Sequence, residues 1–215
     1  CYLKKGNYIL MKIKMIFDIQ LYLEIIFTLF IIIDPIGYSL IFFALTKDYE
    51  KNIKNKISLY SVFYSSIILI LYLFLGNILL NLIHVDIGAM KITGGLALFK
   101  TAYTIVYGEK NNYEIVNNLN DTKIAIYPLS TGILAGPGTL TTIIILSHDY
   151  SEFYEYFTMI LGIFTILFVC FIFSLLTEYL NRIDRNLLDI LNITIGLLLS
   201  SLSLTFIING IKLFF

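Results

Sequence analysis

The hydrophobic residues of this chain fall into six long blocks that are separated by short polar segments. A helix that spans a bilayer needs about 20 predominantly apolar residues, and every block is at least that long. The third block is the weakest, because it contains Lys91 and Lys100. The pattern predicts an all-α membrane protein with six transmembrane helices, for which the lipid bilayer is the principal partner. The predicted spans are Leu21–Thr46, Ile57–Ile83, Ile87–Gly108, Ile124–Ser147, Tyr156–Thr177 and Ile190–Ile211.

Two of these blocks contain helix-breaking residues near their centres. The first block has Asp34-Pro35-Ile36-Gly37, and the fourth has Ala135-Gly136-Pro137-Gly138. Inside a helix, proline costs about 3 kcal/mol and glycine about 1 kcal/mol relative to alanine. In a membrane, such breaks occur where the freed backbone is buried in protein or lines a cavity. Paired breaks in the two halves of a chain indicate a transporter-like binding site, so we predict broken helices at Pro35 and Pro137.

The longest polar connection divides the chain into two units of three blocks each. A single shift along the sequence superposes Gly37 on Gly138 and Gly95 on Gly196. Because three is an odd number, the second unit enters the membrane from the opposite side. We therefore predict two inverted three-helix repeats, with a broken first helix in each half, whose breaks meet near the midplane. The predicted segments are an N-terminal extension ahead of the expected natural start (1–14), a first repeat (15–108), a polar linker (109–121) and a second repeat (122–215).

The composition agrees with a membrane protein and disfavours several other classes. The chain is 58% hydrophobic and 14% charged, against roughly 45–50% and about 25% in soluble domains. The net charge is zero and no basic block is present, so we expect no nucleic-acid partner. Cys1 and Cys170 are far apart, and the two histidines lie at block ends. No catalytic or metal-binding motif occurs, so we expect neither an enzyme nor a bound metal or cofactor.

Lysine and arginine residues suggest an orientation in the membrane. They gather in the connections after the first, third and fifth blocks, which favours a cytoplasmic location for these connections and an external N-terminus. The lysines that precede the first block favour the opposite orientation, so both remain open.

The two breaks carry the candidate chemistry. Asp34 is an ionisable residue near the centre of a predicted span, which makes it a functional-site candidate. Its carboxylate suits a coupling proton or Na⁺ ion, or the ammonium group of an amino acid. The alternative is a helix N-cap, since Asp followed by Pro35 is a good helix start. Gly136-Pro137-Gly138 would expose backbone N–H groups to an anion such as a substrate carboxylate, or would serve only as a packing kink.

Other residues each allow two interpretations. Thr139 offers a hydroxyl beside the second break, although threonines in apolar helices often serve only as interhelical hydrogen bonders. Lys100 either pairs with Asp34 or extends its long stem to the membrane interface. His84 and Asp86 form either a proton relay or a solvated pair at the end of a span. Small residues allow neighbouring helices to approach closely, and the predicted packing glycines are Gly94, Gly95 and Gly196.

Several motifs along the chain match one known family. They are Ile33-Asp34-Pro35-Ile36-Gly37 with Ile41–Thr46, Gly94–Phe99, Pro128-Leu129 with Leu134–Thr139, and Gly196–Leu199 with Phe206–Gly210. From about Met15 onward the chain resembles the MarC family (UPF0056-type) of integral inner-membrane proteins. The resemblance implies a multi-pass protein of the bacterial cell inner membrane. Some relatives are associated with transport of small neutral amino acids, so amino acid transport is an expectation too. Tyr38 stands where the family usually has Asn.

These observations lead to two hypotheses about function. The first is a secondary transporter or exporter of a small polar metabolite, such as a neutral amino acid. The second is a non-transporting membrane scaffold or subunit whose breaks serve packing. A cavity beside Asp34 would favour the first hypothesis, and dry, filled packing there would favour the second. The sequence does not indicate the oligomeric state. The predicted substrate-binding residues are Asp34, Gly37, Tyr38, Ala135, Gly136, Gly138 and Thr139.

Overall fold

The structure is a computed structural model that describes residues 19–107, 121–150, 152–177 and 185–215. All secondary structure in these residues is helical. A helix over 19–33 is followed, after Asp34, by α2 (Pro35–Thr46). The other elements are α3 (Lys51–Leu82), α4 (Ile87–Tyr107), α5 (Asp121–Ile124), η1 (Ala125–Leu134), α6 (Pro137–Asp149), α7 (Phe153–Leu175) and α9 (Arg185–Lys212). The predicted extension (1–14) and nearly all of the predicted linker lie outside the described residues.

Several of these helices are long and apolar enough to cross a membrane. Among the described residues there are four, and the pair η1–α6, bent by 52°, makes a fifth if it is one span. The four are Ile19–Thr46, Lys51–Leu82, Phe153–Leu175 and Leu187–Lys212. α4 is not among them, because its lysines, glycines and threonines lower its hydropathy. The prediction of an all-helical membrane protein is confirmed at this level.

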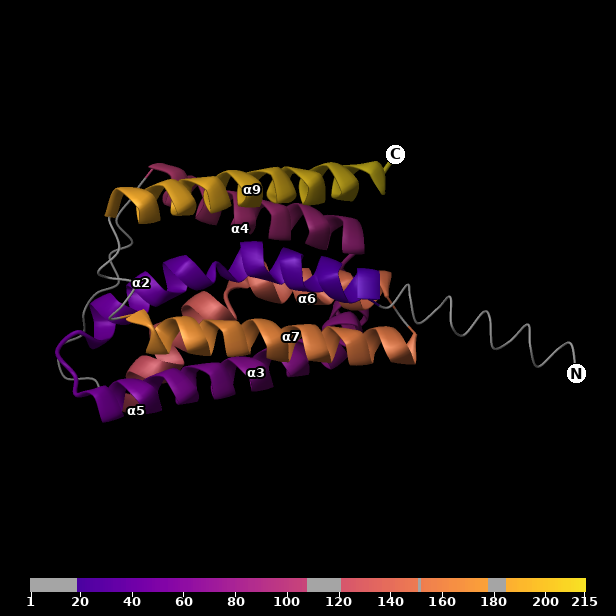
Figure 1. Cartoon of the computed structure of the whole chain (residues 1–215). Helices are drawn as coiled ribbons and strands as arrows, with labels where there is room; N and C mark the ends of the chain where they lie inside the picture. Colours follow the sequence, from indigo (N-terminus) through magenta and orange to yellow (C-terminus); the bar gives the residue numbers. More distant parts are fainter. Residues whose placement is uncertain (1–18, 108–120, 151, 178–184) are drawn as a thin grey trace, which may run out of the picture.

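The helices form one bundle with two distinct ends (Figure 1). We call the end that carries Lys47 and Lys51 the lysine end, and the end that carries His84 and His148 the histidine end. α3 runs between them over 32 residues, or about 48 Å at 1.5 Å per residue. The helix over 19–33 begins at the histidine end, and α9 finishes there (Figure 1).

Two groups of helices pack around separate apolar clusters. The larger cluster includes Leu29, Leu69, Leu129 and Ile163, and it joins the helix over 19–33, α2, α3, η1, α6 and α7, which we call the main body. A smaller cluster of Ile32, Leu98, Ala102 and Leu199 joins α4 and α9 to the first helix. Figure 1 shows the α4–α9 pair lying along one side of the main body.

The three predicted packing glycines lie at close helix contacts. A Cβ atom added at Gly95 would lie 2.8 Å from the carbonyl oxygen of Ser203 on α9, and one added at Gly196 would lie 2.8 Å from Val106 on α4. At Gly94 the added atom would lie 2.8 Å from Thr141 on α6. Gly95 and Gly196 therefore permit the close α4–α9 pairing, whereas Gly94 permits close contact between that pair and the main body.

α3 has a row of buried serines that face the other helices of the main body. The sequence analysis did not identify this row. Ser58, Ser61, Ser65 and Ser66 recur at helical spacing on its inward face. The Ser65 hydroxyl donates to Ser130 of η1 at 3.1 Å, and Ser58 is hydrogen-bonded to a serine of α7. Hydroxyls of this kind join helices where no hydrophobic force acts between them.

Candidate functional site

At the first break, one residue interrupts the helix and caps the next one. Asp34 has φ 48° and ψ 77°, which is the left-handed region, and Pro35 follows at the first helical position. The carboxylate oxygen Oδ1 of Asp34 accepts a hydrogen bond from the Gly37 backbone N–H at 3.0 Å. A Cβ atom added at Gly37 would lie 2.3 Å from the other carboxylate oxygen. Gly37 therefore makes room for a carboxylate that is itself only 7% exposed.

At the second break, the backbone separates two helices without help from a side chain. η1 finishes at Leu134, and the Ala135 N–H donates to the Ser130 carbonyl at 2.7 Å. Gly136 is the N-cap of α6 in an extended conformation, with no side-chain hydrogen bond to the new helix. The first N–H groups of any helix lack intrahelical partners. The α6 start therefore presents backbone donors rather than a carboxylate.

The two breaks border one cavity, which we call the break cavity. Its volume is about 340 Å³. Six of the seven predicted substrate-binding residues line it, and Pro137 does as well: the six are Asp34, Gly37, Tyr38, Gly136, Gly138 and Thr139. Ala135 and Pro35 are not among the lining residues, since both are buried in the packing behind the breaks. The sequence thus identified both walls that come from the broken helices.

A third wall comes from α4, which the sequence analysis treated mainly as a packing helix. Ala97, Thr101 and Thr104 lie on one face at helical spacing and line the cavity together with Lys100. The threonine hydroxyls donate to carbonyls of the preceding turn, so their oxygens keep accepting capacity toward the cavity. Among the described residues, no ion pair joins Lys100 to Asp34. The i, i+4, i+7 spacing of Ala97, Thr101 and Thr104 was the sequence signal that could have identified this face of α4.

Tyr38 borders the break cavity with its ring. Its hydroxyl is hydrogen-bonded to Ser61 of α3 at 2.9 Å, and Ser61 is not a lining residue. The ring centroid lies 6.1 Å from that of Phe42, and the side chain is 1% exposed. Tyr38 therefore supplies a rigid wall, while its polar group serves the contact with α3.

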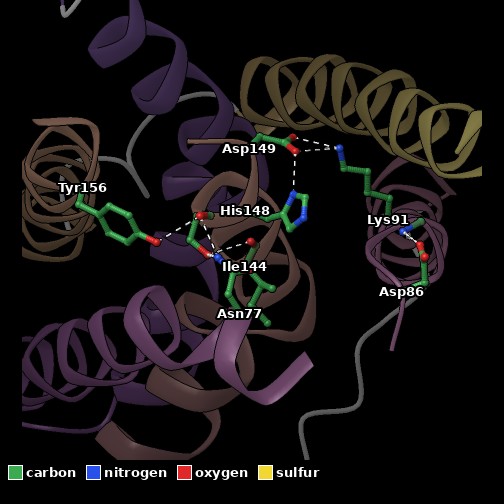
Figure 2. Close-up of polar contacts among 9 residues, drawn as sticks. Asn77, Asp86, Lys91, Ile144, His148, Asp149 and Tyr156 are labelled. Atoms are coloured by element: carbon green, nitrogen blue, oxygen red, sulfur yellow. Dashed lines mark hydrogen bonds and ion pairs between the residues drawn. The ribbon is translucent and has the colours of Figure 1, made fainter. Parts of the chain in front are cut away.

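His84 and Asp86, the predicted relay, lie away from the break cavity, at the histidine end. The Asp86 carboxylate accepts a hydrogen bond from the Gly88 backbone N–H at 2.6 Å and begins α4. No hydrogen bond between His84 and Asp86 occurs among the described residues. In the same region Lys91 forms an ion pair with Asp149 at 3.0 Å (Figure 2). Within the described ranges, no group of three His, Cys, Asp or Glu side chains has the arrangement of a metal site.

Apolar helices of spanning length, two of them interrupted at a shared cavity, define an integral membrane protein of the helical class. A family model described as "MarC family integral membrane protein" matches residues 19–215. The chain belongs to the MarC family, as its motifs suggested.

Curated relatives cover nearly the whole chain. A "UPF0056 membrane protein" of Buchnera aphidicola subsp. Baizongia pistaciae is 31% identical over 216 residues, covering 94% of this chain and 97% of that protein. Another from Buchnera aphidicola subsp. Schizaphis graminum is 31% identical, covering 93% and 95%. One from Methanocaldococcus jannaschii is 30% identical, covering 91% and 98%. No solved structure matches the chain.

Proposed function

We propose that this protein is a secondary transporter or exporter of a small polar metabolite, with its substrate site in the break cavity. The observation that carries the proposal is that both helix breaks, including Asp34, line the same cavity. A scaffold whose breaks served packing alone would fill this space with side chains. The presence of the cavity favours the transporter over the scaffold.

The chemistry of the cavity suits a small zwitterion. Asp34 offers a carboxylate to an ammonium group, and the start of α6 offers backbone donors with a favourable helix dipole to a carboxylate. The volume of about 340 Å³ lies at the lower end of the roughly 300–1,000 Å³ range of ligand pockets. A neutral amino acid is therefore our preferred substrate, and Asp34 is the residue at which we place a coupling proton or Na⁺ ion.

The path of the chain supports six spans arranged as inverted repeats. α2 runs from its break toward the lysine end, whereas α6 runs from its break toward the histidine end (Figure 1). α4 has 21 residues and is about 32 Å long at 1.5 Å per residue, which matches a hydrocarbon core of about 30 Å. We accordingly propose α4 as a span, and the bacterial inner membrane as the location.

Uptake into proteoliposomes tests the proposal. Purified protein is reconstituted, and entry of radiolabelled glycine, alanine and serine is followed with and without an imposed proton or Na⁺ gradient. We expect Asp34→Asn and Gly138→Leu to abolish flux. The controls are Asp189→Asn, which makes the same change as Asp34→Asn, and Ala44→Leu, which introduces the same side chain as Gly138→Leu. Both lie at exposed positions outside the cavity, and both variants should keep the flux. Equal flux in all four variants would contradict the site.

A further inference from the structure

A second cavity lies at the histidine end of the bundle, and the candidate site does not use it. Its volume is about 590 Å³, and its polar lining comes from Asn77, Asn81, His84, Asp86, His148 and Tyr156. We call it the histidine-end pocket. Asn77 donates to the Ser147 carbonyl at 2.8 Å, as Figure 2 shows. The side-chain oxygen of Asn77 is buried and has no hydrogen-bond partner among the described residues.

α6 separates this pocket from the break cavity. Thr139, in its first turn, lines the break cavity, whereas Ser147 and His148, in its last turns, line the histidine-end pocket. Ser147 follows Thr139 by eight positions in the sequence, which corresponds to about 12 Å of helix. The side chains over 141–145 are all buried. The two cavities thus lie at opposite ends of α6, and its buried segment over 141–145, which we call the plug, separates them.

The plug is closed by glycine contacts on both sides of α6. A Cβ atom added at Gly76 of α3 would lie 2.6 Å from Ile144, and one added at Gly94 of α4 would lie 2.8 Å from Thr141. The contact with α4 is the boundary between the main body and the α4–α9 pair. Small residues let packed helices approach closely.

Among the described residues, an ion pair joins the two groups of helices at the histidine end. Lys91 of α4 contacts both carboxylate oxygens of Asp149, at the end of α6, at 3.1 and 3.0 Å. The side chains are 15% and 42% exposed. His148 also lies 3.4 Å from Asp149. This ion pair crosses the α4–α6 boundary at the histidine end, whereas the break cavity lies along the same boundary on the side toward the lysine end.

We infer that the α4–α6 boundary is the gate of the transport path and that the histidine-end pocket is its second entrance. In this structure the gate is closed, and the Lys91–Asp149 ion pair holds it. Movement of the α4–α9 pair away from α6 breaks the ion pair and connects the pocket with the break cavity. Rocking of one bundle against another around a fixed midplane site is an established mode of alternating access. The inference rests on the proposed transport function and adds its second entrance.

A cysteine-accessibility experiment tests the gate without knowledge of the substrate. The reporter is Thr101→Cys, an exposed lining residue of the break cavity, in a full-length background with Cys1→Ser and Cys170→Ala. A membrane-impermeant maleimide is applied to vesicles of each orientation. Val85→Cys and Asp48→Cys, both exposed, identify the histidine side and the lysine side.

We expect Lys91→Asp to raise the rate of reporter labelling from the histidine side by about fivefold, an effect of the size that a partly exposed ion pair supports. Labelling from the lysine side stays unchanged. The charge swap Lys91→Asp with Asp149→Lys restores the parent rate. Asp189→Lys, an exposed charge reversal on α9, leaves both rates unchanged, and the melting temperature of each variant verifies folding.

Two results would overturn the gate: a histidine-side rate that Lys91→Asp does not change, or a charge swap that fails to restore the parent rate. A failure of the transport proposal gives a result that differs from both of these. If the reporter responds as expected while no solute enters proteoliposomes, the boundary opens and closes but the protein does not carry the tested solutes.

Discussion

The two helix breaks interrupt the chain with different chemistry. The first uses one side chain, since Asp34 adopts a left-handed conformation and caps α2 with its carboxylate. The second has no side-chain cap: Gly136 is the N-cap residue of α6, and Pro137 follows in the first turn. A helix break is thus made with a carboxyl side chain on one wall of the cavity and with backbone N–H donors on the other. For the proposed function, this difference would let one small cavity bind both ends of a zwitterion.

The largest stability difference between the breaks is expected at the glycines of the second. Gly136→Ala places a Cβ atom 2.9 Å from the Gly132 carbonyl oxygen, and backbone cannot move aside as a side chain can. We expect a loss of about 1–3 kcal/mol in unfolding free energy. Gly138→Ala is the matched control, because its Cβ meets the end of the Leu98 side chain. Denaturant unfolding in detergent measures both, and equal losses would contradict the backbone role of Gly136.

The stability of the first break should depend on the side chain of Asp34. Asp34→Ala removes the acceptor for the Gly37 N–H, so we expect a loss of about 1 kcal/mol, typical of an N-cap. Asp34→Asn keeps an acceptor oxygen and should retain most of that stability while abolishing flux. Thermal melting compared with proteoliposome uptake separates the two roles. Equal destabilisation by Asn and Ala would show that the charge, rather than the cap, stabilises the break.

A smaller effect on stability is expected at Tyr38, which lines the break cavity. Tyr38→Phe removes the hydrogen bond to Ser61 and keeps the ring that borders the cavity. Such bonds contribute about 0.6 kcal/mol on average in membranes, so we expect a slightly lower melting temperature and flux near that of the unmodified protein. A severe loss of flux with unchanged melting temperature would instead place the hydroxyl at the substrate.

The breaks could be predicted from the sequence because proline and glycine act locally. Asp34-Pro35 and Gly136-Pro137 are interruptions in any helical context, and family motifs supported the same positions. The α4 wall with Thr101 and Thr104 was missed, because a helix that is apolar on most sides does not reveal which face borders a cavity. The serine row of α3 was missed for a related reason. Tyr127 has an extended backbone (φ −136°, ψ 126°) that interrupts the helical geometry inside η1. Because the residue before a proline is disfavoured from helical geometry, Tyr127-Pro128 was a local signal that the sequence analysis did not use.

The most direct test of the central claim is a thermal-shift screen of the purified protein with small polar solutes, including neutral amino acids. We predict that at least one solute raises the melting temperature of the unmodified protein and that Asp34→Asn and Gly138→Leu abolish this shift, while Asp189→Asn retains it. A shift of equal size in all four proteins would place the ligand outside the break cavity and contradict the account.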